Sequence, residues 1–196
     1  MPNLMITLTE IAGAWAMAVV IGICLGYAIG MNNTIADIYE PFFYVIFSIP
    51  LIIVYPVIYL WVGVGETSKM IFGALLGLFP LTINTISGFR QINPLFFRLS
   101  KSLRLGSGRT LLRIVLPAAA PSLMAGLRQS LASATIGVVT GEILASSQGL
   151  GFIIVYADST LNVGLLFAMI VLVLVIAFAF TEVLRVIEKR MYAHAT

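Results

Sequence analysis

The side chains that could do chemistry are few, and they exclude more functions than they suggest. Cys24 and His194 are the only cysteine and histidine, so the chain has neither an internal disulfide nor a Cys/His metal site. None of the three lysines follows a glycine, so the phosphate-binding G-K-[ST] loop of a nucleotide hydrolase is absent. The polar residues that remain of interest are Arg128, Thr135 and Glu142, which recur every seven residues in an apolar stretch.

These residues belong to a chain with the composition of a membrane protein. Of its 196 residues, 60% are hydrophobic and 10% are charged, and the mean hydropathy is +1.07. An ordinary soluble domain has about 25% charged residues. Stretches of about 20 residues with almost no charge are long enough to cross a bilayer as helices. We therefore predict one transmembrane domain, residues 1–196, that is all-α and has about five spans: 9–31, 42–63, 69–89, 114–141 and 162–184.

The positions of the basic residues predict how the spans are oriented. The loop 90–113 contains six basic residues and no acidic one, and such loops remain in the cytoplasm. Counting spans from this loop places the N-terminus outside and the C-terminus in the cytoplasm. Because these basic residues lie between spans, we expect them to set orientation and not to bind nucleic acid.

Polar side chains on the third and fourth spans predict a translocation pathway. Ionisable residues at membrane depth indicate such a pathway, although Arg128 could instead reach the inner headgroups and Glu142 could lie at the outer interface. The segment 143–161 is too polar and interrupted to be a span, so we expect a re-entrant or interfacial segment on the outer side, beside a cavity. The predicted pathway residues are Asn84, Ser87, Arg128, Thr135, Glu142, Ser146 and Ser147.

The fourth span also has a stripe of small residues on its other side, where another helix could approach closely: Gly126, Ser130, Ala134, Gly137 and Gly141.

The basic loop contains a short amphipathic helix. Asn93-Pro94 is a favourable helix start. One face of the helix is apolar and consists of Leu95, Phe96, Leu99 and Leu103. The other face is basic and consists of Arg98, Lys101 and Arg104. Such a helix either lies on the anionic inner leaflet or enters a groove of a cytoplasmic protein.

Taken together, the motifs resemble the permease subunits of type I ABC importers, most closely the nitrate, sulfonate and taurine branch. The likeness rests on Ile114-Val-Leu116-Pro117, Gly141-Glu142 and Gly149-Leu150-Gly151, and it extends from about Thr7 to Arg190. It implies a multi-pass subunit of a bacterial or archaeal plasma (inner) membrane that binds no cofactor itself. The implied partners are a second permease copy or paralogue, two ATPase subunits that hold ATP and Mg, and an extracytoplasmic solute-binding protein. The loop helix would be the coupling helix, which contacts the ATPase through Leu95, Phe96, Arg98, Leu99, Ser100, Lys101, Ser102, Leu103 and Gly106.

Two features depart from the family pattern. The family's coupling motif begins Glu-Ala-Ala, and here the triplet falls on 98–100 when counted back from Pro117, or on 100–102 when Gly106 takes the place of the family's glycine. The acidic residue is missing in both alignments. The branch also commonly begins with one more span, so the chain is either a five-span variant or truncated.

We therefore expect a transport subunit that is not an enzyme: the permease of an ATP-driven importer for a small solute such as an oxyanion or sulfonate. The alternative is a small dimeric transporter or channel that works without ATP through Asn84 and Glu142. A membrane-embedded enzyme is disfavoured, since the spans contain no histidine and no paired carboxylates for acid-base or metal chemistry.

Overall fold

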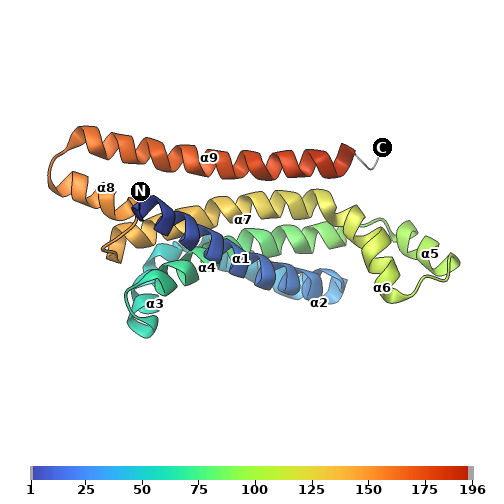
Figure 1. The fold of residues 1–196 in the computed structure, drawn as a ribbon. Helices are drawn as coiled ribbons and strands as arrows, with labels where there is room; N and C mark the ends of the chain where they lie inside the picture. The colour runs from blue at the N-terminus through green and yellow to red at the C-terminus, as the bar shows by residue number, and fades with distance from the viewer. Residues whose placement is uncertain (1, 194–196) are drawn as a thin grey trace.

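The computed structural model describes residues 2–193, without the side chains of residues 101, 107, 187 and 191–193. Within this range the chain folds into helices joined by short turns, with no strand (Figure 1). In chain order the elements are α1 (Pro2–Gly30), α2 (Asn33–Ser48), a 3-10 turn (Leu51–Val54), α3 (Tyr55–Val62), α4 (Glu66–Arg90), α5 (Pro94–Ser102), α6 (Ser107–Thr110), a π-helical turn (Leu111–Val115), α7 (Leu116–Ala145), α8 (Leu150–Ser159) and α9 (Val163–Ala193).

Among residues 2–193, four helices are long and apolar enough to cross a membrane: Pro2–Gly30, Glu66–Arg90, Gly108–Ala145 and Val163–Arg190. A fifth span results if α2 and the segment Leu51–Val62 count as one broken helix. The prediction of an all-helical membrane protein with about five spans is confirmed. The polar segment after α7 contains only α8, a helix of ten residues, which is too short to span.

The second predicted span, 42–63, differs from the structure in two ways. Its helix begins at Asn33, because the side chain of Asn32 accepts the backbone N–H groups of Thr34 and Ile35 at 3.0 and 3.3 Å and caps the helix there. It is also interrupted, with an 81° bend between α2 and the following segment. Ile49 and Pro50 are extended at this point, since a proline has no N–H to donate and disfavours helix in the residue before it.

Helices α4 and α7 pack lengthwise at the centre, and α1 crosses them. Small residues permit this close approach. A Cβ built on Gly137 of α7 would lie 2.7 Å from the Cα of Gly73 in α4, and one on Gly77 would lie 2.9 Å from the Ser130 carbonyl oxygen. The small-residue stripe predicted on the fourth span is therefore confirmed as a contact surface. However, the other side of α7 is also buried at Thr135 and Glu142, so α7 is covered on two sides.

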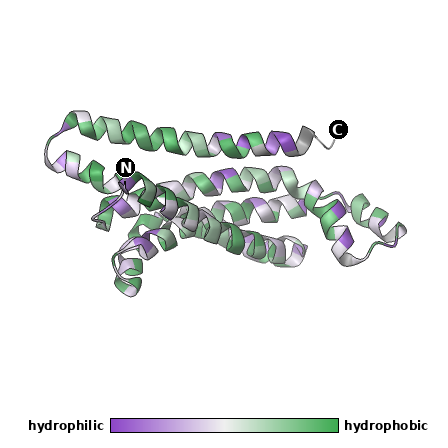
Figure 2. Ribbon diagram, viewed as in Figure 1, coloured by the Kyte–Doolittle hydropathy of each residue, from purple (hydrophilic) through white to green (hydrophobic). Residues whose placement is uncertain are grey.

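Helix α9 contacts α7 and α8, and Leu184 in its C-terminal half is buried in a cluster with Ile11 and Leu131. Most of it is apolar, and hydrophilic residues gather toward its C-terminal end (Figure 2). No residue of its most hydropathic window is buried inside the chain. Figure 1 places the N-terminus beside α8, whereas α5, α6 and the C-terminal part of α9 lie at the opposite end of the bundle. We refer to these as the α8 end and the α5 end.

Candidate functional site

The predicted pathway residues are distributed along the bundle. Asn84 and Ser87 lie in the α5 half of α4, Arg128 lies midway along the long helix Gly108–Ala145, and Glu142, Ser146 and Ser147 lie at the α8 end. Each group has its own hydrogen-bond partners.

Asn84 forms an amide pair with a residue that the sequence did not single out. Its Nδ2 donates to the Pro80 carbonyl at 2.7 Å and to Gln129 Oε1 at 3.1 Å, which joins α4 to α7. Asn84 is half-buried and Gln129 is exposed. An available signal was that Gln129 is the only glutamine in the fourth predicted span. The pair places two amide side chains on an open side of the two central helices.

Ser87 belongs to a charged cluster at the α5 end. Its hydroxyl donates to Glu40 Oε1 at 3.3 Å, and Arg90 donates to Glu40 and to Asp37, each at 2.6 Å. Arg90 and these two carboxylates border a cavity of about 460 Å³ between α2 and the end of α4. The first basic residue of the loop is thus neutralised by α2, and it fixes α2 against α4.

Arg128 forms an ion pair with Glu188 of α9. The two side chains are 30% and 20% exposed, so they are partly shielded from solvent. The sequence alone does not indicate this partner. The positive charge of Arg128 is offset locally, and the pair attaches the C-terminal half of α9 to α7.

Glu142 lies inside the bundle at the α8 end and is 1% exposed. Its carboxylate accepts the Thr7 hydroxyl at 2.6 Å and the Gly151 backbone N–H at 2.8 Å. Thr135 is also buried, and its hydroxyl donates to the Leu131 carbonyl of its own helix at 2.8 Å. Both side chains point into the packed interior of this chain.

A second buried pair, which the sequence did not reveal, lies beside Glu142. Lys69 of α4 pairs with Glu10 of α1, and the Lys69 ammonium also donates to the Ser146 hydroxyl at 3.2 Å. Ser146, Ser147 and Lys69 contribute to the wall of a 220 Å³ cavity at this end. Glu10 and Lys69 stand at the starts of two predicted spans, where a charge is expected to face water, so the sequence gave no reason to pair them.

The predicted coupling helix is present as α5. Asn93 Oδ1 accepts the Leu95 N–H at 2.9 Å, which confirms the predicted start. The apolar face is exposed, with Leu95, Leu99 and Leu103 at 65%, 48% and 59%. Phe96 and Arg98 are also exposed. The Ser102 hydroxyl donates to the Arg98 carbonyl, and Gly106 lies in the turn before α6. The Lys101 side chain lies outside the described residues.

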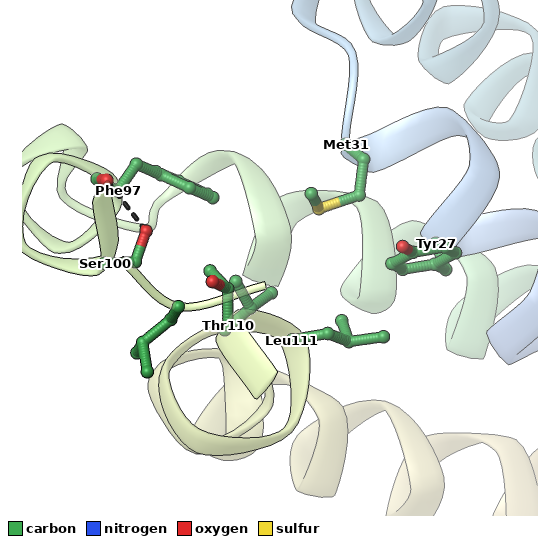
Figure 3. Close-up of a pocket in the computed structure, with 8 residues that line it drawn as sticks. Tyr27, Met31, Phe97, Ser100, Thr110 and Leu111 are labelled. Atoms are coloured by element: carbon green, nitrogen blue, oxygen red, sulfur yellow. Dashed lines mark hydrogen bonds between the residues drawn. The ribbon is translucent and has the colours of Figure 1, made fainter. Parts of the chain in front are cut away.

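Ser100 differs from the other predicted coupling residues because it points inward. It is 5% exposed, and its hydroxyl donates to the Phe97 carbonyl at 2.8 Å. Figure 3 shows both residues at a cavity of about 330 Å³ that separates α5 from Tyr27 and Met31 at the end of α1. Thr110, at the end of α6, and Leu111, at the start of the π-helical turn, also line the cavity.

Comparisons with known proteins agree with this architecture. Residues 18–192 match the family described as binding-protein-dependent transport system inner membrane component. The chain is 30% identical to the taurine transport system permease protein TauC of Escherichia coli, over 96% of this chain and 69% of that protein. It is 30% identical to the nitrate import permease protein NrtB of Synechocystis, over 76% of this chain and 54% of that protein. Its fold resembles an inward-facing structure of the MetNI methionine ABC transporter, with a TM-score of 0.81, 17% identity, and coverage of 99% of this chain and 94% of that one.

Proposed function

The chain belongs to the family of inner membrane components of binding-protein-dependent transport systems, and we propose that the open side of α4 and α7, marked by Asn84 and Gln129, lines its translocation pathway. The chain is a multi-pass permease subunit of an ABC importer and is a transport component, not an enzyme. Permeases of this family work with ATPase subunits and a solute-binding protein.

The observation that carries the pathway proposal is the exposed amide pair. Asn84 and Gln129 lie within the two central helices, both of which are long and apolar enough to cross a membrane. Exposing amides to lipid is costly, because hydrocarbon offers them no hydrogen bonds. This side of the bundle therefore faces water or a second permease. Ser87 lies one turn from Asn84 and extends the polar surface toward the α5 end, while Ser146 and Ser147 border the cavity at the α8 end.

The proposed solute is a small oxyanion or sulfonate. The relatives named for taurine and nitrate support this class of solute. Amide N–H groups can donate to sulfonate or nitrate oxygens without a full positive charge that would hold the anion too tightly. Arg128 contributes little net charge to such a pathway, since Glu188 pairs with it.

The proposed assembly is two permeases, a second copy of this chain or a paralogue, above two ATPase subunits that hold ATP and Mg. The basic loop 90–113 supports placing the α5 end in the cytoplasm, with the N-terminus outside and the C-terminus inside. The exposed apolar residues Leu95, Leu99 and Leu103 would then enter a groove of the ATPase, as amphipathic helices do in other complexes.

The pathway is tested by uptake into vesicles that contain the permease with its ATPase and binding protein. We expect Asn84→Leu combined with Gln129→Leu to reduce ATP-dependent uptake about tenfold or more while the complex still assembles. The matched control is Gln91→Leu, since Gln91 is an exposed amide at the end of α4 outside the pair. Equal uptake by the double variant and the wild type would remove this surface from the pathway.

The energy source and the coupling helix are tested in the same vesicles. Uptake that persists without nucleotide would favour the alternative of an ATP-independent transporter. For the coupling helix, Leu99→Glu should abolish co-purification with the ATPase while the permease still folds. Leu112→Glu is the control, because Leu112 is a similarly exposed leucine outside α5. Retained ATPase binding in the Leu99 variant would refute the docking role.

A further inference from the structure

Three backbone N–H groups at the N-terminus of α8 are capped by side chains from other helices. The backbone N–H groups of three consecutive residues, Gly149, Leu150 and Gly151, donate to Asn3 Oδ1 at 3.0 Å, Thr7 Oγ1 at 2.9 Å and Glu142 Oε2 at 2.8 Å. The first N–H groups of any helix lack partners within the helix. Here α1 supplies two acceptors and α7 supplies the third, so the start of α8 is fixed to two helices at once.

The two glycines in this segment are explained by the same contacts. Gly149 has a backbone φ of 101°, which favours glycine, and a Cβ there would overlap the Glu142 carboxylate. A Cβ at Gly151 would lie 2.7 Å from both Glu142 Cβ and the Val139 carbonyl oxygen. The Gly-Leu-Gly motif is therefore complementary to the Glu142 side chain, and the two form one structural unit.

Glu142 is suited to this contact by charge as well as by position. A carboxylate at a helix N-terminus is stabilised by the N–H groups and the helix dipole. Thr7 links the two parts of the cap, because its hydroxyl donates to Glu142 Oε1 at 2.6 Å while its oxygen accepts the Leu150 N–H. Loss of either side chain would leave a buried backbone donor of α8 without its acceptor.

The position of α8 also determines the position of α9. Helix α8 continues through a turn at Thr160–Asn162 directly into α9, where Asn162 caps the new helix by accepting the Leu165 N–H at 3.1 Å. Helix α9 buries Leu184 in its C-terminal half, whereas no residue of its most hydropathic window is buried within this chain, so the position of its first turns depends on where α8 is held. Ser146 and Ser147, which border the cavity at this end, directly precede the capped residues in the sequence.

We propose that Glu142 is a positioning residue: with Thr7 and Asn3 it fixes α8, and through α8 the start of α9, at the mouth of the pathway, and it does not contact the solute. The transport consequence rests on the proposed function, whereas the docking of α8 does not. Transport requires this cap because a free α8 leaves α9 and the neighbouring cavity without a fixed geometry.

The test compares Glu142→Gln and Thr7→Val in the assembled transporter in lipid nanodiscs. Hydrogen exchange measures the amides of residues 149–153, and uptake is measured in vesicles. A charge-assisted hydrogen bond to a buried group is worth enough for its loss to accelerate exchange roughly tenfold. We expect both variants to raise exchange at 149–153 by about this factor and to lower uptake to a similar extent. The double variant should be no worse than the stronger single one, and Thr7→Ser should restore both readouts.

Matched controls separate this role from general effects. Asp158→Asn removes an exposed carboxylate from α8 itself, and Thr9→Val removes an exposed hydroxyl that donates to the Ile6 carbonyl of its own helix, so neither should change exchange at 149–153. A rise in exchange throughout residues 74–86 of α4 would indicate loosening of the whole bundle and would overturn the specific role.

Two further outcomes separate this proposal from the function itself. Suppose that Glu142→Gln abolishes uptake, that Thr7→Val takes up solute like the wild type, and that neither variant changes the hydrogen exchange of α8. Glu142 then acts in the pathway, and the proposal is wrong. If the wild type itself shows no ATP-dependent uptake, the proposed function fails, and the exchange data still decide whether Glu142 and Thr7 hold α8.

Discussion

The ion pair between Lys69 and Glu10 offers a direct measure of how much stability depends on buried charge. The side chains of Lys69 and Glu10 are 3% and 1% exposed, and they join α4 to α1. The Lys69 ammonium is in direct contact with the Glu10 carboxylate, so Lys69 is the group that compensates its charge. We expect Lys69→Met to leave this carboxylate buried and uncompensated.

The expected cost follows from the charges that share this site. Removing one partner of a buried ion pair destabilises a protein by about 3–5 kcal/mol, whereas replacing both with neutral residues is often close to neutral. Glu142 lies near enough to Glu10 to interact with it electrostatically. Lys69→Met therefore leaves two neighbouring carboxylates with no cation between them, while Glu10→Gln leaves one carboxylate and one ammonium. We expect Lys69→Met to be the more damaging single change, and Lys69→Met with Glu10→Gln to recover most of the loss.

The assay is the free energy of unfolding of the permease in a bilayer or bilayer-like micelle, measured for the wild type, both single variants and the double variant. Arg185→Met is the matched control, because Arg185 and Glu182 form an exposed pair within one helix, at 3.1 Å. Exposed pairs of this kind contribute about 0.3–0.5 kcal/mol. A loss for Lys69→Met as small as that of the control, or a double variant as unstable as Lys69→Met, would refute the reasoning.

Three further predictions concern contacts between helices. Gly137→Ala should cost about 2 kcal/mol of unfolding free energy, because its Cβ would meet the backbone of the neighbouring helix. Gly108 has open space around it, so Gly108→Ala should cost under about 0.5 kcal/mol. Equal effects of the two substitutions would contradict the close approach of α4 and α7. Glu188→Gln should raise hydrogen exchange over residues 176–186 about fivefold, since it breaks the ion pair with Arg128, and unchanged exchange would show that the pair does not hold α9. Arg90→Met should raise exchange over residues 33–40 by a similar factor; an effect restricted to α4 would argue against the contact with α2.

Features that depend on local sequence could be predicted. A charge-free run of about 20 residues has few alternatives to a membrane helix, and the Asn93-Pro94 start of α5 depends only on neighbouring backbone groups. The boundaries were less accurate for a physical reason. Hydropathy marks the part of a helix that crosses lipid, but helices extend beyond it, as α1 does from the predicted residue 9 back to Pro2. The start of α2 at Asn33 was likewise not recognised, because its first turns are polar.

The partners of the polar side chains could not be predicted in the same way. Thr7 and Glu142 are separated by 135 residues, and Arg128 and Glu188 by 60. The spacing of seven correctly indicated that Arg128, Thr135 and Glu142 share a side of α7, and that Arg128 and Glu142 needed separate partners. Which helix covers that side depends on how every helix is rotated about its axis, and no local pattern records this rotation. Sequence reasoning consequently placed Glu142 beside solvent or solute, whereas the structure places it beneath α8.

The few charged residues of this chain contribute to the association of its helices in lipid. Apolar surfaces alone do not drive helices together in a bilayer, because lipid tails are as apolar as the side chains. Four ion pairs that join different helices each involve α4 or α7: Glu10–Lys69, Asp37–Arg90, Glu40–Arg90 and Arg128–Glu188. Each pair attaches one outer helix, α1, α2 or α9, to the glycine-packed centre. A motion transmitted through α5 would therefore act first on α4 and α7, between which α5 lies in sequence, and the outer helices would follow through these pairs.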